Sequence, residues 1–324
     1  MGIIFNQKRF IFSLFFNELI KSDPIILADA GAKDGLHQPW LNLDKAGSLY
    51  VIGFEPDKDE CDKLNATKKP NRIYIPAALW SSEGKVDIHL AQIRSTSSVY
   101  APNFEFIKQY KDCHWKPRIT KSVITVDSVI LDKVLKDKKI DCDFLKIDTQ
   151  GAEFEIIQGA TRSIADNIFG VLIETWTSEV HSGQHLTGDI LTSMTKLGFS
   201  LFDISIAAAW QRKIDKNIKL FGKKQVIGLD LLFFKDTNKF VEGGKKLNKI
   251  IKAAAISDVY GFPDYALEIL NSANNMDDGI ETLKNIKDNI IGNSLKQNRF
   301  YRKSMRVLFK ILGVKNYDFP SLHY

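Results

Sequence analysis

The sequence predicts a doubly wound α/β fold with a largely parallel sheet, on three observations. Short apolar runs alternate with helical patterns between residues 25 and 234. Several runs are apolar at consecutive positions, which is typical of strands buried on both faces of a parallel sheet. A glycine-containing turn follows the first run, at the strand end where such sheets bind ligands. We therefore expect helices on both faces of the sheet.

The chain has 324 residues, of which 44% are hydrophobic, enough for one substantial core. We predict an aromatic N-terminal helix over residues 1–22, a main domain over residues 23–236 and a helical C-terminal extension over residues 237–324. No stretch reaches the roughly 20 apolar residues of a spanning helix, and no signal-peptide cleavage site follows Phe16. We expect a cytoplasmic protein.

Composition excludes several classes of function. A formal charge of +6, from 45 basic and 39 acidic residues, is too even for a dedicated nucleic-acid binder. Three cysteines without CxxC spacing predict neither a disulfide framework nor a zinc site. Clusters with metal-ligand spacing are absent from the sequence. No metal and no nucleic-acid partner is expected.

The strands of the main sheet can be placed in chain order. They are expected at Ile25–Ala28, Tyr50–Phe54, Arg72–Ile75, Phe144–Ile147, Val171–Ile173, Ser200–Ile204 and Ile227–Phe234. Lys85–Leu90 alternates polar and apolar residues, which predicts an antiparallel hairpin strand on the margin of that sheet. The segment Ser95–Lys121 has no clear period and is predicted to be a long loop. Beyond Lys235 only helical patterns remain.

The loop Asp29–Gly35, of sequence DAGAKDG, follows the first strand. Its glycines let the backbone approach a ligand closely. Its spacing is not that of a dinucleotide fingerprint, because Asp29 stands where the first glycine should be. That carboxylate would repel a pyrophosphate and attract the ammonium of an amino-acid ligand. The alternative is an ordinary turn.

Glu55 and Pro56 follow the second strand, about 20 positions after the glycine loop. A carboxylate at this distance is placed to accept hydrogen bonds from the ribose hydroxyls of an adenosine. The alternative is a carboxylate that caps a helix. Ala78 and Leu79, after the third strand, fall where an adenine ring would lie against small apolar side chains.

The segment Phe144–Ala160, of sequence FLKIDTQGAEFEIIQGA, is the most specific motif. Asp148 stands at the carboxyl end of its strand, and Gly151 lets the chain turn sharply into a helix. With Phe54-Glu55-Pro56 and the Asp-Gly loop, this motif resembles the FkbM family of methyltransferases. The resemblance extends roughly from Ile25 to Phe234.

The resemblance implies a Rossmann-like methyltransferase sheet whose last strand, here Ile227–Phe234, is antiparallel, so that residues 23–236 would bind S-adenosylmethionine. Asp29, Gly31 and Gly35 are implied near its methionine part, Glu55 on its ribose and Asp148 near the transferring methyl group. The full set expected to contact the cofactor is Asp29, Ala30, Gly31, Asp34, Gly35, Glu55, Pro56, Ala78, Leu79 and Asp148. An alternative role for Asp148 is to cap the helix that starts near Ala152.

Such enzymes usually methylate hydroxyl groups on glycans, lipids or natural products, so we expect a small-molecule or glycan acceptor. The family tends to have an aromatic-rich loop after Glu174, whereas this chain has Trp176, Glu179, His181 and His185. The resemblance therefore leaves the acceptor open. His181 is the candidate base for a hydroxyl nucleophile; the alternative, which we favour, is a surface histidine without a catalytic role.

The C-terminal segment from Lys296 to Lys315 has seven cations, no acidic residue and interleaved apolar residues. A basic amphipathic helix of this kind can lie on an anionic membrane. It can equally pack its apolar face on the domain, which we favour because apolar stripes at helical spacing usually face a core.

Two other functions compete with methyl transfer to a saccharide, glycolipid or related metabolite. A nicotinamide-dependent oxidoreductase would use a similar sheet, but Asp29 conflicts with its phosphate loop. A non-catalytic scaffold that binds S-adenosylmethionine would keep the fold without turnover. The presence of Asp29, Glu55 and Asp148 together favours an enzyme.

Overall fold

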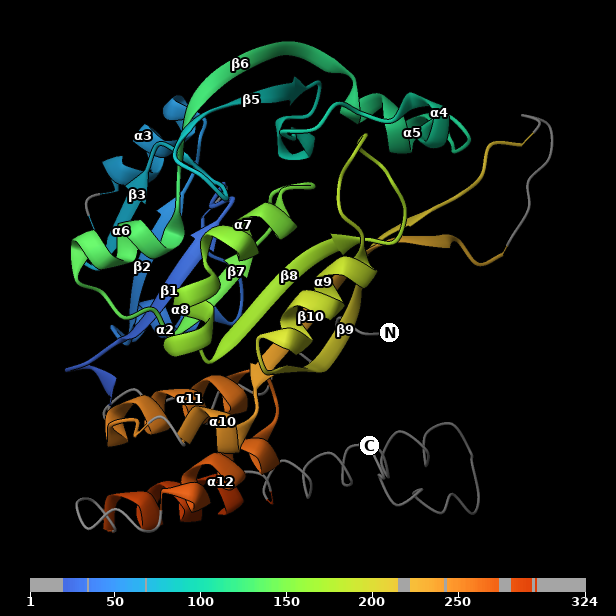
Figure 1. The fold of residues 1–324 in the computed structure, drawn as a ribbon. Coiled ribbons are helices and arrows are strands. Elements are labelled where there is room, and N and C mark those ends of the chain that lie inside the picture. Colours follow the sequence, from blue (N-terminus) through green and yellow to red (C-terminus); the bar gives the residue numbers. More distant parts are fainter. Residues whose placement is uncertain are drawn as a thin grey trace, which may run out of the picture.

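Seven strands form one central sheet in a computed structural model of the chain (Figure 1). The structure describes residues 20–33, 35–67, 69–214, 222–241, 244–273, 281–292 and 295. The strand order across the sheet is β3-β2-β1-β7-β8-β10-β9. The strands are β1 (Ile25–Ala30), β2 (Leu49–Phe54), β3 (Arg72–Ile75), β7 (Phe144–Ile147), β8 (Gly170–Trp176), β9 (Phe199–Trp210) and β10 (Gln225–Lys235).

The directions of the strands confirm the predicted fold class. The pairs β1–β2, β2–β3, β1–β7 and β7–β8 are parallel. Strand β10 is antiparallel to both of its neighbours, β8 and β9. All seven predicted strands lie in this sheet, and the last one is the antiparallel strand that was expected. From β1, the strands β2 and β3 extend the sheet to one side, and β7 and β8 extend it to the other. Ligands of doubly wound sheets bind at such a change of direction, here between β1 and β7.

A second sheet of three strands corrects two sequence predictions. It has the order β4 (Ala78–Leu79), β6 (Thr120–Val129) and β5 (Gly84–Ala91). Lys85–Leu90 was expected on the margin of the main sheet, but it pairs antiparallel with β6. The predicted loop Ser95–Lys121 includes the first residues of β6 and short helical turns. These turns are η2 (Arg94–Thr96), α4 (Phe104–Ile107), α5 (Asp112–Trp115) and η3 (Lys116–Arg118).

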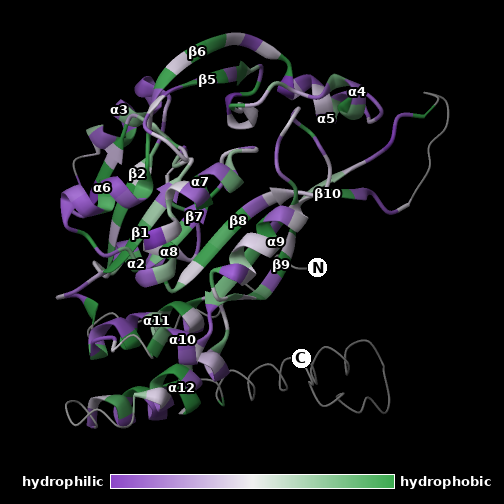
Figure 2. Cartoon of the chain, viewed as in Figure 1, coloured by the Kyte–Doolittle hydropathy of each residue, from purple (hydrophilic) through white to green (hydrophobic). Residues whose placement is uncertain are grey.

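Consecutive residues of the parallel strands point into two different cores. Leu27 and Phe144 belong to one hydrophobic cluster, whereas the next residues, Ala28 and Leu145, belong to another. This alternation is the period of two expected for strands buried on both faces. The middle of strand β8 is hydrophobic in Figure 2, whereas helix α6 (Leu131–Lys138) is largely hydrophilic.

Helices cover both faces of the sheet. The face that carries Ala28 and Leu145 packs against α6, α7 (Glu153–Gly159), α8 (Thr161–Asp166) and α9 (Thr187–Lys196). Helix α2 (Trp40–Lys45) packs on the other face. Helix α3 (Lys58–Ala66) packs through Cys61 against Tyr74 of β3.

The helices after residue 236 share a core with the sheet. They are α10 (Thr237–Val241), α11 (Leu247–Val259) and α12 (Pro263–Ser272), and residues 281–292 are helical as well. Ile250, Ala254 and Ile269 belong to the same buried cluster as Leu27 and Phe144. The helical character expected of residues 237–324 is thus present in the described part of that range, packed directly on the domain.

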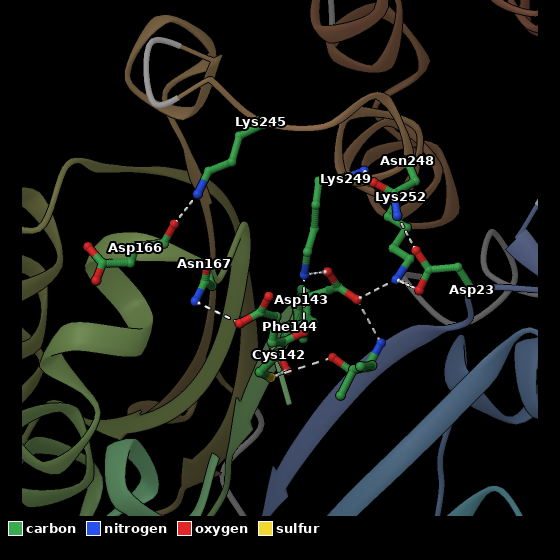
Figure 3. Close-up of polar contacts among 12 residues, drawn as sticks. Asp23, Cys142, Asp143, Phe144, Asp166, Asn167, Lys245, Asn248, Lys249 and Lys252 are labelled. Carbon is green, nitrogen blue, oxygen red and sulfur yellow. Dashed lines mark hydrogen bonds and ion pairs between the residues drawn. The ribbon is translucent and has the colours of Figure 1, made fainter. Parts of the chain in front are cut away.

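Polar contacts centred on Asp143 join α11 to the amino-terminal ends of β1 and β7 (Figure 3). The Oδ1 atom of Asp143 lies 2.5 Å from Lys249 Nζ, and its Oδ2 atom lies 3.4 Å from Lys252 Nζ. The same Oδ2 atom accepts a hydrogen bond from the backbone N–H of Ile26 at 2.9 Å. Lys252 also pairs with Asp23 at 2.5 Å. The buried charges of Asp143 and Lys252 are therefore each compensated by more than one partner.

Two predicted segments fall outside the description. The N-terminal helix over residues 1–22 lies outside it up to residue 19, and the basic segment from Lys296 to Lys315 lies wholly outside it. Among the described residues, no helix combines the length and the apolar character needed to cross a membrane.

Candidate functional site

The turn after β1 brings the backbones of β1 and β7 into close contact. Gly31 has φ +80°, and a Cβ atom on it would lie 2.0 Å from the carbonyl oxygen of Asp148. The backbone N–H of Asp148 in turn donates to Ala30 O at 3.1 Å. Only glycine satisfies both the conformation and the contact. This packing fixes the position of Asp148 relative to the first loop.

A cavity of about 200 Å³ opens at the carboxyl ends of β1, β2 and β7. Seven of the predicted site residues line it: Ala30, Gly31, Glu55, Pro56, Ala78, Leu79 and Asp148. The second sheet contributes Ile88, Leu90 and Ile124 to the lining. The basic residues that line it are Lys33, His37, Arg94 and Lys146, none of which was among the predicted contacts. The sequence motifs from three separate strand ends therefore meet in one cavity.

Two other predicted residues lie outside this lining. Asp29 is 2% exposed and pairs through Oδ1 with Lys146 Nζ at 3.1 Å, so it reaches the cavity only through that lysine. Gly35 has φ +78° and its N–H donates to Ala32 O, which makes it part of the turn itself. Asp34 lies outside the described residues.

Glu55 is a buried carboxylate directly after the last residue of β2. It is 6% exposed, and its Oε1 atom accepts a hydrogen bond from the N–H of Asp57 at 2.9 Å. Burial raises the pKa of Glu55 to about 6. The side chain that caps α3 is Asp57, which accepts from the N–H groups of Asp59 and Glu60. The alternative role of Glu55 as a helix cap is therefore wrong.

Charged side chains line up on one face of the sheet across four strands. Asp29 faces Lys146 in the β1–β7 register, and Glu174 faces Asp230 in the β8–β10 register. Asp148 lies two residues beyond Lys146 on the same face, and its Oδ2 atom is 3.8 Å from Lys146 Nζ. The side chain of Asp148 is 44% exposed, against 3% for Asp29. Of the four carboxyl groups in this row, Asp148 is the one that lines the cavity.

The carboxyl groups in this row have opposite pKa shifts. Burial raises the pKa of Glu174 to about 10, and the neighbouring Asp148 carboxylate adds to the shift. Burial also acts on Asp148, but its contacts with Glu174 and Lys146 outweigh it and lower the pKa of Asp148 below the usual value. At neutral pH Asp148 is ionised and Glu174 is protonated. Two close carboxyl groups divide their charge in this way because both cannot ionise cheaply.

The turn between β7 and α7 holds Asp148 in place. A single oxygen, Glu153 Oε1, accepts hydrogen bonds from Thr149 N, Thr149 Oγ1 and Gly151 N at 3.0–3.2 Å. Gln150 has φ +59°, an uncommon conformation for a residue other than glycine. Helix α7 has Ala152 as its N-cap and no side-chain cap, so the alternative role of Asp148 as a cap is wrong.

Gln150 connects this turn to β8. Its Nε2 atom donates to Glu174 Oε2 at 2.8 Å and lies 3.5 Å from Asp148 Oδ1. Its Oε1 atom is buried without a hydrogen-bond partner. Sequence reasoning missed Gln150, Glu174 and Lys146 as site residues. The available signal was the spacing of Lys146 and Asp148, which places both on one face of a strand.

His181 lies outside the lining of the cavity. It is fully buried, its Nδ1 atom is 3.0 Å from Gln184 Oε1, and burial lowers its pKa to about 3. A histidine in this position is neutral and separated from solvent. The placement gives the predicted base no support, and it also corrects the favoured alternative, since His181 is not a surface residue.

Neither a disulfide bond nor a metal site is found among the described residues. Cys61, Cys113 and Cys142 are free thiols. Within the described part of the chain, no group of three or more His, Cys, Asp or Glu side chains is arranged to hold a metal ion.

Two methyltransferases of known structure are similar to this chain. One similar solved structure is the methyltransferase FkbM from Methylobacillus flagellatus KT, at 15% identity and a TM-score of 0.35, over 64% of this chain and 44% of that one. Another is a precorrin-6y C5,15-methyltransferase from Geobacter metallireducens GS-15, at 10% identity and a TM-score of 0.34, over 68% and 87% of the two chains. The chain thus spans less than half of the M. flagellatus protein. Curated proteins yield no match.

The family assignment comes from a sequence model. The model of the methyltransferase FkbM domain matches residues 29–201, more than half of the chain. The matched range includes the glycine loop, Glu55, the Asp148 motif and Glu174. The chain therefore belongs to the FkbM family of methyltransferases.

Proposed function

We propose that this protein is an S-adenosylmethionine-dependent methyltransferase that methylates a hydroxyl group of a saccharide, glycolipid or related metabolite. The observation that carries the proposal is the single cavity in which Glu55 and Asp148 both appear. They follow β2 and β7, which flank β1, so a ligand that contacts both must span about 10 Å, two strand spacings. S-adenosylmethionine is an elongated molecule, with ribose hydroxyls suited to Glu55 and a cationic sulfonium suited to Asp148.

The residues present fit such a cofactor. Glu55 is buried with a single hydrogen bond from Asp57, so its carboxylate has acceptor capacity left for two ribose hydroxyls. Ala78 and Leu79 offer small apolar surface for an adenine ring. The partly exposed Asp148 offers a negative charge at the position expected for the transferring methyl group. Asp29, expected near the methionine part, instead pairs with Lys146.

When bound, S-adenosylmethionine supplies an electrophilic methyl group on a sulfonium. The acceptor hydroxyl forms the new C–O bond, the methyl–sulfur bond breaks, and the hydroxyl proton is released. Asp148 is ionised and exposed, so it can orient the hydroxyl and accept that proton. Gln150 and Lys146 hold the Asp148 carboxylate in place. Alignment of this kind can supply a large share of the rate enhancement.

The test is methyl transfer from S-adenosylmethionine labelled in its methyl group to glycan and lipid fractions, with products identified by mass spectrometry. Asp148→Asn keeps the size of the side chain and removes its charge. We expect near-normal melting and cofactor affinity but turnover reduced by about 10²-fold or more. Asp141→Asn, an exposed aspartate before β7, is the matched control and should behave as wild type. Normal turnover in the Asp148 variant would contradict its role.

A further inference from the structure

A strongly basic part of the surface lies beside the site. It consists of residues 104–121, 208–213 and 222–224, here named the basic lobe. The short helices α4 and α5 lie near the ends of β9 and β10 (Figure 1) and share a hydrophobic cluster with them. Lys111 N donates to Gln211 O at 3.0 Å, and Lys213 N donates to Gln109 O at 2.9 Å. Backbone contacts therefore join the first two segments into one unit.

The lobe concentrates the positive charge of the chain. It has nine basic residues: Lys108, Lys111, Lys116, Arg118, Lys121, Arg212, Lys213, Lys223 and Lys224. Its only acidic residues are Glu105 and Asp112, so its excess of positive charge is larger than the +6 of the whole chain. Asp112 pairs with Lys116 at 2.8 Å. A field of one sign raises the local concentration of ligands of the opposite sign.

Arg118 is the buried member of the lobe. It is 8% exposed, and its guanidinium lies 4.8 Å from the ring centre of Trp210 and 5.4 Å from that of Trp176. Its Nη1 atom donates to the carbonyl oxygen of His114, and its Nε atom is buried with no partner. Arg118 forms no ion pair among the described residues, and Glu174 is the acidic group whose charge acts on it. A buried cation without an anion is costly, so its charge points to a ligand.

The lobe adjoins the proposed acceptor side of the site. Trp176 lies two residues beyond Glu174 on the same face of β8, and the two face Gly228 and Asp230 of β10. Pro117 O accepts from Ile93 N at 3.0 Å, next to the cavity-lining residues Arg94 and Ser95. In the strand order, β8 lies on the opposite side of β1 from β2, which carries Glu55. An acceptor at Asp148 can therefore extend toward Arg118 without crossing the cofactor region.

We propose that the acceptor carries a phosphate group, which binds to the basic lobe with Arg118 as the buried cationic contact. The proposal rests on the function proposed above and adds the chemical class of the acceptor. A phosphate has one or two negative charges and several acceptor oxygens, which match a guanidinium and nearby lysines. The phosphate belongs either to a soluble phosphorylated metabolite or to a lipid headgroup.

The experiment measures phosphate binding by the full chain at low ionic strength. Inorganic pyrophosphate is titrated by calorimetry, and sedimentation is measured with phosphatidylglycerol vesicles and with neutral phosphatidylcholine vesicles. The lobe variant combines Lys108→Gln, Lys111→Gln and Lys213→Gln, all at exposed positions. The matched control combines Lys45→Gln, Lys136→Gln and Lys138→Gln, which remove the same charge from exposed positions elsewhere. Arg118→Met removes the buried charge and retains an apolar stem between the tryptophans.

We expect the wild type and the control to bind pyrophosphate or the anionic vesicles, and the lobe variant to bind at least about tenfold more weakly. Arg118→Met should show a similar loss, with partial recovery in Arg118→Lys. Binding of pyrophosphate identifies a soluble phosphate, and binding of anionic vesicles alone identifies a headgroup. No binding to either probe, or equal loss in the lobe variant and the control, would overturn the proposal. Affinity for S-adenosylhomocysteine is measured on the same samples, so failure of the cofactor assignment is seen separately.

Discussion

The Nε2 atom of Gln150 lies 2.8 Å from Oε2 of Glu174, although the two residues belong to different strand-end segments. The contact ties the turn after β7 to the end of β8, on the side where the acceptor is proposed to bind. The Oε1 atom of Gln150 is buried and has no hydrogen-bond partner among the described residues.

Gln150→Glu should reduce turnover by at least about tenfold, because it places a third carboxyl group beside Asp148 and Glu174 and removes the bridging donor. Gln158→Glu makes the same change at an exposed position of α7 and should leave turnover unchanged. The measurement is kcat with labelled S-adenosylmethionine and a product from the acceptor screen. Equal kcat for both variants would show that Gln150 has no part in the site.

Glu153 should make stability depend on pH. Burial raises its pKa from the ordinary 4.5 to about 7. A raised carboxyl pKa means that the contribution of Glu153 to stability is fully present below pH 4.5 and is lost as pH rises through 7. The difference amounts to about 3 kcal/mol at most.

Glu153→Gln should therefore gain stability relative to wild type between pH 5 and pH 8, as measured by urea unfolding at both values. The exposed Glu83→Gln is the control, for which the difference from wild type should not change with pH. A pH-independent difference for Glu153→Gln as well would mean that the buried carboxyl group does not titrate in this range.

Asp143 should be essential for anchoring α11 to the sheet. Asp143→Asn leaves the buried Lys252 without one of its two carboxylate partners, and loss of one partner of a buried pair costs about 3–5 kcal/mol. The exposed Asp141→Asn should cost less than about 0.5 kcal/mol. Urea unfolding measures both, and equal free energies of unfolding would show that the contacts in Figure 3 contribute little.

Most of the main sheet could be predicted because several of its strands are apolar at consecutive positions, as in Ile25–Ala28. Of the second sheet, only β5 was predicted as a strand. Strand β4 has only two residues, and β6 exposes much of its length, so neither has the pattern of a buried strand. The helical turns around Arg118 are too short to show a helical period.

The cofactor side of the site was predictable because Gly31, Glu55 and Asp148 each follow a strand within a local motif. The opposite side of the site could not be predicted, because it depends on which residues of neighbouring strands lie side by side. Gln150 and Glu174 meet because β7 and β8 pair in parallel, and Arg118 reaches Trp176 from a segment with no sequence pattern. Burial of His181 likewise results from the packing of distant residues, which its place in the sequence does not reveal.

The central claim is that Glu55 and the cavity bind S-adenosylmethionine. Its most direct test is calorimetric titration of the wild type and Glu55→Gln with S-adenosylhomocysteine, with NADH as the contrasting ligand. We expect one site in the wild type, no NADH binding, and a loss in Glu55→Gln on the order of 1.5–3 kcal/mol per hydrogen bond, roughly ten- to a hundredfold in Kd. Wild-type affinity should also fall below pH 6, where Glu55 becomes protonated. No binding of S-adenosylhomocysteine, or equal affinity in the folded Glu55 variant, would contradict the account.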